Sequence, residues 1–122
     1  MPTDSRLELG RRGEDLALEH LLRRGYAVVT RNHRTRWGEI DLIVHDERTL
    51  VFCEVKTRRA GSGHPWWSLG PAKQQRVRRR ASEFLATVDD RPRGLDLRFD
   101  AVGVVIDAAG RLVRLDHLEA AF

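Results

Sequence analysis

Two short stretches of the sequence place charged residues at spacings that suit chemistry. Asp41 lies in the apolar run EIDLIV, and Glu54 and Lys56 lie in FCEVKTR. Side chains alternate between the two faces of a β-strand, so Glu54 and Lys56 share one face while Cys53 and Val55 share the other. Burying charge is costly unless the charge is paired or liganded. The pattern therefore predicts a site that uses these charges.

A second polar face runs along the stretch that contains Asp41. Glu39 and Asp41 share one face of residues 39–44, and three apolar side chains form the other face: Ile40, Leu42 and Val44. If this strand neighbours the FCEVKTR strand, we expect the two polar faces to meet on the same side of the sheet. Glu14 is expected to join them from a helix, because it is in register with the apolar stripe of that helix.

The charge balance of this cluster indicates what it needs. Glu14, Asp41 and Glu54 contribute −3 and Lys56 contributes +1, which leaves −2. Two carboxylates about 4 Å apart repel by about 4 kcal/mol at an effective dielectric near 20. A divalent cation would balance the charge, and oxygen ligands suit Mg²⁺ or Mn²⁺ rather than zinc. Arginines, a protonated carboxylate or ordinary ion pairs such as Glu39 with Arg36 would balance it too, and spacing alone leaves both interpretations open.

The type of basic residue at position 56 is unusual for this chain. Of the 22 basic residues only Lys56 and Lys73 are lysine, and the other 20 are arginine. Coding preference accounts for the general bias. The exception at position 56 favours a role for a compact, movable ammonium that a planar guanidinium cannot fill.

Periodicity and turn residues predict the elements that position these groups. The fold class is α/β: a mixed sheet core in the order helix, three-strand meander, helix, strand, flanked by helices, within a single domain of residues 1–122. The expected elements are a helix at 5–24, strands at 26–32, 39–44 and 50–58, a loop at 59–70, a helix from 71 to about 88, a strand at 95–106 and a last or edge strand at 111–118.

Composition limits the setting and the partners. A net charge of +4 and a pI near 10.2 favour a polyanionic partner. No apolar run is long enough to span a bilayer, and the N-terminus lacks the apolar core of a signal peptide. With the single cysteine, Cys53, expected in the core, we expect a cytoplasmic protein with no membrane partner. Asp100, inside an apolar strand, is expected to pair with a neighbouring arginine.

At this point the motifs resemble a known group. Asp41 followed by Glu54-Val55-Lys56 on the next strand resembles the signature of the PD-(D/E)XK nuclease superfamily, of which only the aspartate of "PD" is matched here. The stretches GRRGEDLALEHLLRRGY, RNHRTRWGEIDLI, FCEVKTRR and PAKQQRVRRRASEFL resemble the YraN-like family of predicted endonucleases, which is similar to archaeal Holliday-junction resolvases. The resemblance covers roughly residues 10–107 and implies a restriction-endonuclease-like fold.

The resemblance also implies a catalytic role for four side chains. Asp41 and Glu54 would bind the metal ion, Mg²⁺ or Mn²⁺, together with the carbonyl of Val55. Lys56 would orient or help to deprotonate the attacking water and stabilise charge on the phosphate. Glu14 matches the acidic residue of the first helix and would hold water at the metal. For Glu39 we favour a surface ion pair over a ligand.

Basic residues flank the expected site and are candidates for phosphate contacts. Lys73 and Gln75 lie near the active face in the resemblance, and Gln75 would bond substrate or water; a solvated helix start is the alternative. Trp66 and Trp67 are candidates for base stacking, for packing or for a homodimer contact. The arginine candidates are Arg31, Arg34, Arg36, Arg58, Arg59, Arg76, Arg78, Arg79 and Arg80.

Taken together, the sequence predicts an Mg²⁺- or Mn²⁺-dependent endonuclease that hydrolyses phosphodiester bonds in DNA. The resemblance favours branched or single-stranded DNA over RNA. The alternative is a catalytically silent nucleic-acid-binding module of the same fold. Intact Asp41, Glu54 and Lys56 favour the enzyme, because a binding module has no need of them.

Overall fold

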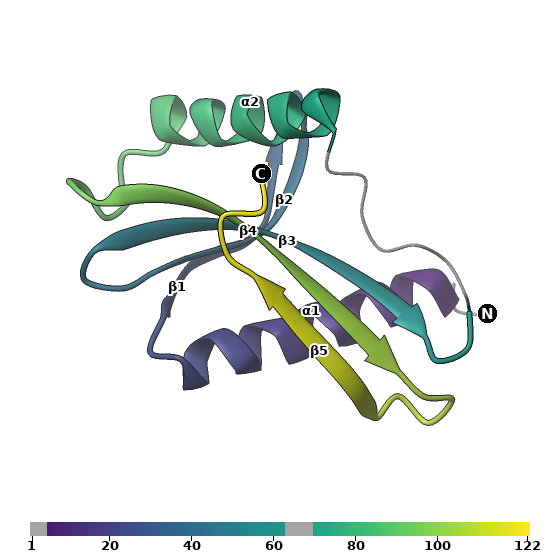
Figure 1. Ribbon diagram of the computed structural model, residues 1–122. Helices are drawn as coiled ribbons and strands as arrows, with labels where there is room; N and C mark the ends of the chain where they lie inside the picture. Colours follow the sequence, from purple (N-terminus) through teal and green to yellow (C-terminus); the bar gives the residue numbers. More distant parts are fainter. Residues whose placement is uncertain (1–4, 63–69) are drawn as a thin grey trace.

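Two helices pack on opposite faces of a five-stranded sheet (Figure 1). This computed structural model describes residues 5–62 and 70–122. Its elements in chain order are α1 (Ser5–Arg23), β1 (Ala27–Thr35), β2 (Gly38–His45), β3 (Thr49–Arg59), α2 (Pro71–Thr87), β4 (Asp96–Ile106) and β5 (Leu112–Leu118). No helix of the described ranges is long and apolar enough to cross a membrane.

The strands follow one another across the sheet in the order β1-β2-β3-β4-β5. The first three form an antiparallel meander, β4 is parallel to β3 after the crossover through α2, and β5 is antiparallel to β4 at the edge. The predicted mixed α/β class is therefore confirmed, and the open mixed sheet with two flanking helices is compatible with a restriction-endonuclease-like fold. The closing segment forms an edge strand, as one of the two expected alternatives.

Both faces of the central strands β2, β3 and β4 are buried, because each helix turns an apolar stripe onto one face of the sheet. Cys53 lies in the α1-side core, as predicted. The α1-side core contains Leu16, Ala17, Leu21, Leu42, Val44, Val51, Cys53, Val102, Val104 and Ile106. The α2-side core contains Ile40, Ile43, Leu50, Phe52, Val77, Ala81, Phe84, Phe99, Ala101 and Phe122.

The alternation of side chains along β2 breaks at Asp41. Leu42 and Val44 belong to the α1-side core, whereas Ile40 belongs to the α2-side core. The prediction that Ile40 shares a face with Leu42 and Val44 is therefore wrong. The register places Asn32 of β1 opposite Asp41, and Asn32 has a left-handed backbone, with φ of 50°. This irregularity interrupts the strand alternation at the residue expected to bind metal.

Gly13 lets α1 pack closely on β3. A Cβ atom at Gly13 would lie 1.6 Å from Oγ1 of Thr57, whereas one at Gly10, in the same helix, would meet nothing within 4 Å. We expect Gly13→Ala to destabilise the fold by about 1–3 kcal/mol, since overpacking forces the helix or the strand to move. Gly10→Ala is the matched control and should be neutral or stabilising by up to about 1 kcal/mol.

Chemical denaturation of both glycine variants checks this prediction. Equal midpoints for Gly13→Ala and Gly10→Ala, at equal denaturant slopes, would contradict the close approach of the helix to the strand.

Asp100 is fully buried in β4 and is held by four hydrogen bonds. Arg98 donates to both carboxylate oxygens at 2.8 Å, His117 bonds Oδ2 at 2.8 Å, and the N–H of Ala120 donates to Oδ1 at 3.0 Å. Burial raises the pKa of Asp100, but these hydrogen bonds outweigh it and the pKa is lowered. The predicted pairing of Asp100 with an arginine is confirmed, and the network fastens β5 and the C-terminal segment to β4.

Candidate active site

The candidate site lies where β2 and β3 separate. Their pairing runs from His45 opposite Leu50 to Leu42 opposite Cys53 and ends there. At the next position the link between the strands is made by a side chain: Oδ2 of Asp41 accepts a hydrogen bond from the backbone N–H of Val55 at 2.8 Å. The carboxylate therefore substitutes for the missing strand-to-strand hydrogen bond and fixes the gap between the two strands.

Burial and like charges act on Asp41. Burial, with a smaller contribution from the carboxylates of Glu14, Glu54 and Glu39, raises the pKa of Asp41 to about 7, although the hydrogen bond from the N–H of Val55 lowers it. A carboxylate with this pKa holds its proton about half the time at neutral pH. The carboxylates at the site thus carry more negative charge than the neighbouring cations neutralise.

Glu54 is paired through one oxygen only. The ammonium of Lys73, in the first turn of α2, lies 2.5 Å from Oε1 of Glu54, and both side chains are only 15% exposed. The second oxygen, Oε2, is buried and has no hydrogen-bond partner. A buried, unpartnered carboxylate oxygen is costly, so this atom is suited to accept a cation or a hydrogen-bond donor.

Glu14 reaches the site from the other face of the sheet. It is half-buried on α1; burial raises its pKa, while hydrogen bonding to Asn32 and the charge of Arg31 lower it and the charge of Glu39 raises it. The expectation that the three carboxylates meet on one face is wrong, because Glu54 lies on the α2 side and Glu14 on the α1 side. Asp41, at the break in β2, is what brings the two sides together.

Lys56 lies two residues beyond Glu54 on β3 and is exposed. Lys73 is the other lysine of the chain, and its ammonium is the ion-pair partner of Glu54. The two positions that depart from the arginine bias are therefore next to the same carboxylate in sequence or in space. Lysine at both positions places compact, movable cations beside the site, where a guanidinium would be planar and rigid.

The donor atoms near the gap fit a hard cation only in part. Among the described residues no three carboxylate, histidine or cysteine groups lie close enough to form a metal site. Asp41 and Glu54 supply carboxylate oxygens, one of them unpartnered, and oxygen donors suit Mg²⁺ or Mn²⁺. Because Mg²⁺ keeps several waters and needs only one or two protein carboxylates, two such groups suffice.

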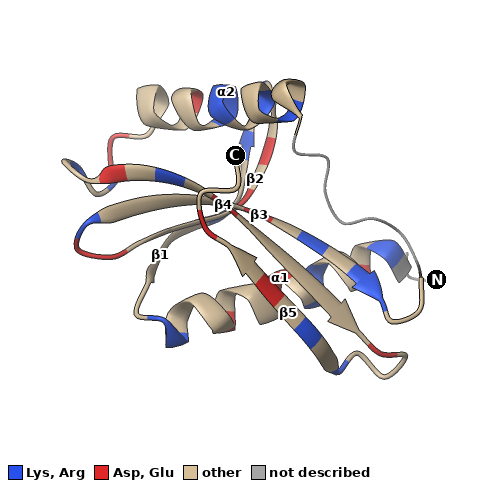
Figure 2. Cartoon of the chain, viewed as in Figure 1, with Lys and Arg blue, Asp and Glu red and all other residues tan. Residues whose placement is uncertain are grey.

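A groove of about 410 Å³ opens beside the carboxylates on the α1 side. Positive and negative side chains both line it. Its lining residues are Arg6, Leu7, Gly10, Arg11, Glu14, Asn32, Arg34 and Glu39. Figure 2 shows the same charge pattern on the ribbon: Lys and Arg mark the N-terminal half of α1, the C-terminal half of β3 and the N-terminal half of α2. A polyanion would therefore meet positive charge on both sides of the carboxylates.

Comparison with known proteins decides the family. The Uncharacterised protein family UPF0102 matches residues 13–104. The chain belongs to the UPF0102 family. It is similar to UPF0102 proteins of Chlorobium limicola, with 42% identity over 119 residues (93% of this chain, 91% of the relative), and of Streptomyces griseus, with 47% over 108 residues (88% and 90%). A UPF0102 protein of Nocardia farcinica is 44% identical over 115 residues, covering 93% of this chain and 88% of the relative.

The YraN-like resemblance is thus supported at the level of the UPF0102 family. The names of the family and of these relatives state no reaction. Membership of the nuclease superfamily, the metal and the DNA partner remain predictions.

The predicted nucleic-acid contacts of this UPF0102 chain separate into distinct places. Arg34 lines the groove beside Glu14. Three others, Arg36, Gln75 and Arg79, line a second groove of about 660 Å³ over α2. Lys73 lies in the carboxylate site. Of the rest, Arg76 is exposed on α2 and Arg58 is half-buried on β3.

Several of the arginines proposed for phosphate contact have partners within the protein. Arg36 pairs with Glu83, at 4.0 Å, rather than with Glu39, and Arg31 pairs with Asp15 at 2.8 Å. Trp66, Trp67 and the homodimer contact proposed for them lie outside the described residues, so that expectation stays a prediction.

Two features of the site were missed by the sequence reasoning. The first is the Lys73–Glu54 ion pair, for which the rarity of lysine was an available signal. The second is Arg80, whose side chain donates to the carbonyls of Trp37 and Glu39 at 3.0 and 3.3 Å and so ties the β1–β2 turn to α2. No local pattern distinguishes Arg80 from its arginine neighbours, because the contact depends on how the helix docks.

Proposed function

We propose that this UPF0102 protein is a metal-dependent endonuclease that hydrolyses phosphodiester bonds in DNA. The observation that carries the proposal is the convergence of Asp41 and Glu54 at the gap between β2 and β3, where Oε2 of Glu54 is buried without a partner. A protein gains no stability from such an atom. A cation, a water or a substrate group at that position would account for it.

Each side chain of the site then has a separate task. Asp41 and Glu54 would hold Mg²⁺ or Mn²⁺, with the carbonyl of Val55 as a further ligand, and the ion would supply Lewis-acid polarisation of a phosphate oxygen. Lys56, exposed beside Glu54, would contact the scissile phosphate and orient the attacking water. Glu14 would hold water from the α1 side.

Lys73 would act as a stand-in cation beside Glu54. Its ammonium neutralises Glu54 through Oε1 and leaves Oε2 available. Because an ammonium on a flexible stem moves easily, it can turn toward a phosphate when a divalent ion takes over its place beside Glu54. Its prediction as a nucleic-acid contact is compatible with this exchange.

The surroundings fit a DNA partner in the cytoplasm. The groove beside Glu14 and the positive charge on both helices suit phosphate contacts, and most of the binding energy would come from counterion release. The buried single cysteine suits a reducing compartment.

Calorimetric titration with Mn²⁺ tests the proposed site without requiring turnover. Wild type should bind Mn²⁺, and Asp41→Ala should lose at least tenfold in affinity because one of two carboxylate ligands is removed. Glu39→Ala is the matched control: this carboxylate is close to Asp41 but exposed, and its loss should leave binding within about twofold. Equal Mn²⁺ binding by wild type and Asp41→Ala would remove Asp41 from the metal site.

A second function is favoured by the Lys73–Glu54 ion pair. The pair neutralises one of the two expected ligands, as it would in a nucleic-acid-binding module that keeps the fold without turnover. Salt-sensitive DNA binding with no Mn²⁺ uptake by wild type would support that function over the enzyme.

A further inference from the structure

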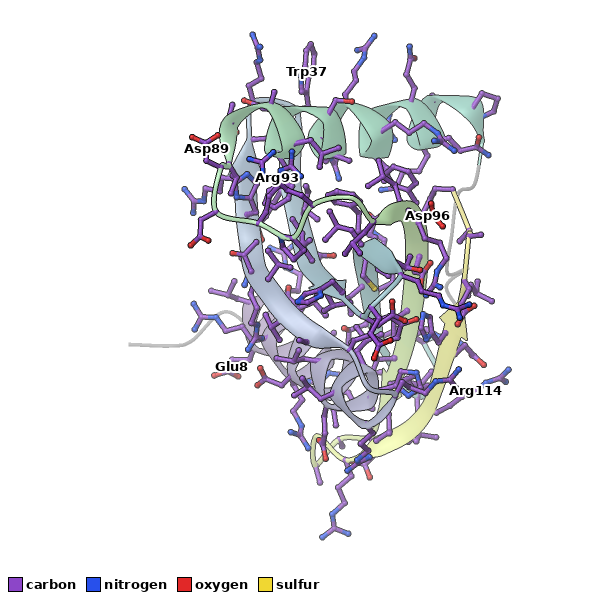
Figure 3. The ribbon with its side chains drawn as sticks, turned by 90° about the vertical axis from the view of Figure 1, so that its left-hand side faces the viewer. Glu8, Trp37, Asp89, Arg93, Asp96 and Arg114 are labelled. Atoms are coloured by element: carbon purple, nitrogen blue, oxygen red, sulfur yellow. The ribbon has the colours of Figure 1, made fainter. Side chains whose placement is uncertain are left out.

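The turn between β1 and β2 exposes a tryptophan. The side chain of Trp37 is 44% exposed, and Figure 3 shows it beyond α2, pointing away from the sheet. Tryptophan contributes a large apolar surface, so a protein normally buries most of it. Trp37 contributes to neither apolar core of the sheet. Its exposure therefore leaves an aromatic surface available to a partner outside the chain.

The turn that presents Trp37 is rigidly built. Oγ1 of Thr35 accepts the N–H of Trp37 at 3.0 Å and donates to the carbonyl of Gly38 at 2.6 Å. Arg80 donates to the carbonyls of Trp37 and Glu39 from the helix side. Gly38 has φ of 119°, and a Cβ there would lie 2.7 Å from the Arg80 guanidinium. The backbone that carries the ring is thus held in place before any partner arrives, which lowers the entropy cost of binding.

Positive charge surrounds the ring. The guanidinium carbons of Arg79 and Arg36 lie 4.9 and 5.7 Å from the centroid of the Trp37 ring. Arg78 also lines the groove of about 660 Å³, although its guanidinium donates to the carbonyl of Phe122. Among the described lining residues Glu83 is the single acidic one, and it is already engaged by Arg36. The remaining lining residues are Pro71, Gln74, Gln75, Ser82, Ala86 and Thr87.

We propose that this groove binds single-stranded nucleic acid, with an unpaired base stacked on Trp37 and its phosphates on Arg36 and Arg79. The proposal rests on the proposed nuclease function and names its substrate class. A nucleotide offers the flat π-surface of its base and, a short distance away, the negative charge of its phosphate. The base would stack on the indole ring while the phosphate contacts the neighbouring guanidinium groups. In a duplex the base faces are stacked on one another and are not available to the ring.

The chemistry of the groove favours this occupant over two others. An acidic peptide would satisfy the arginines but has no reason to seek the indole ring. A second copy of the chain would bring a further net charge of +4 toward a groove that is already positive. Both remain distinguishable outcomes of the test below.

The stacking groove and the candidate active site share α2. Lys73 contacts Glu54 from the first turn of the helix, and Arg79 lies six residues later, about 9 Å along the helix axis at 1.5 Å per residue. A single strand held on Trp37 would therefore lie along the same helix as Lys73, a few nucleotides from the carboxylates. This arrangement suits a substrate with a flap or a single-stranded branch.

The test uses Trp37 as its own probe. In a Trp66→Phe, Trp67→Phe background Trp37 is the only tryptophan, since the chain has three. Without divalent ions, so that no cleavage occurs, the protein is titrated with oligothymidylate of about 12 nucleotides, within the footprint of small single-strand-binding folds. The same titration is made with inorganic polyphosphate and with an acidic peptide. We expect oligothymidylate to quench the fluorescence and the two base-free polyanions to leave it largely unchanged.

Affinity is then measured by fluorescence anisotropy of labelled DNA in the natural background. Trp37→Ala should weaken single-strand binding about tenfold and duplex binding by less than twofold, and Trp37→Phe should retain most of the affinity. Leu112→Ala, at a side chain that is 46% exposed on β5, is the matched control and should bind as wild type. Arg114→Ala, also on β5 and far from Trp37 in Figure 3, controls for loss of charge.

The outcomes separate this proposal from the proposed function. Quenching by polyphosphate or by the acidic peptide as strong as by oligothymidylate would overturn it, and so would equal weakening of single-strand and duplex binding by Trp37→Ala. If no DNA is cleaved but single-strand binding depends on Trp37, the proposed binding groove is supported and the proposed nuclease function is contradicted. If DNA is cleaved and Trp37→Ala binds single strands as wild type does, only the proposed binding groove is contradicted.

Discussion

Asp41→Asn is expected to stabilise the protein at pH 8 by roughly 4 kcal/mol when no divalent ion is present. The pKa of Asp41 is raised from 3.8 to about 7 by burial and by neighbouring carboxylates, and each pKa unit corresponds to about 1.4 kcal/mol. An acid whose pKa is raised on folding holds its proton longer in the native state than in the unfolded state. Its contribution therefore opposes folding increasingly as pH rises from about 4 to about 7.

Asparagine removes this opposition, because it resembles the protonated acid and keeps an oxygen for the N–H of Val55. The free energies of unfolding of wild type and Asp41→Asn should nearly coincide at pH 4 and separate up to pH 7, with the variant the more stable. Denaturant unfolding across this pH range measures the difference. Asp89→Asn, at a fully exposed side chain, is the control and should stay within about 0.5 kcal/mol of wild type.

A difference that is the same at pH 4 and pH 8 would contradict the raised pKa of Asp41. A variant less stable than wild type at pH 8 would show that the carboxylate stabilises the gap between β2 and β3. In that case the strand gap would be a structural feature rather than a site kept at a cost in stability.

Lys56→Arg is expected to reduce cleavage about a hundredfold while leaving the fold and metal binding unchanged. The substitution preserves the charge, but the guanidinium is planar, holds its charge on a different set of atoms and does not give up a proton. Loss of one positioned electrostatic contact commonly costs roughly 3 kcal/mol of transition-state stabilisation. Because Lys56 is exposed, the fold should tolerate the change.

The initial rate of cleavage of labelled DNA at saturating Mg²⁺ measures this loss. Arg114→Lys, exposed on β5 and given no role in the site, is the control and should cleave as wild type. Equal rates for Lys56→Arg and wild type would mean that any cation serves at position 56. The presence of lysine rather than arginine at position 56 would then have no functional significance.

The sequence predicts the arrangement of elements well because each helix and strand has its own periodicity. The stripe through Gly13, Ala17 and Leu21 places α1 on the sheet, and the apolar alternation of β3 places Cys53 in the core. The pairing of Asp100 with an arginine also follows from burial alone, since a buried charge requires a partner. These conclusions depend on local rules that tertiary contacts do not overturn.

The details of the site depend on contacts that no local rule contains. The alternation of β2 breaks at Asp41, across from the left-handed backbone of Asn32, so the strict two-residue period fails at the residue that matters most. The docking of α2 brings Lys73 onto Glu54, which sequence spacing cannot reveal. The exposure of Trp37 likewise follows from the way Arg80 holds the turn rather than from the residue type.

The central claim is that Asp41 and Glu54 support metal-dependent hydrolysis of DNA. The most direct measurement is cleavage of end-labelled branched, flapped and linear DNA by wild type and Asp41→Asn, each with Mg²⁺, with Mn²⁺ and with a chelator. Wild type should cleave only when a divalent ion is present, and Asp41→Asn should lose at least a hundredfold in rate at equal or greater stability. Cleavage that survives the chelator, or equal cleavage by Asp41→Asn, would contradict the central claim.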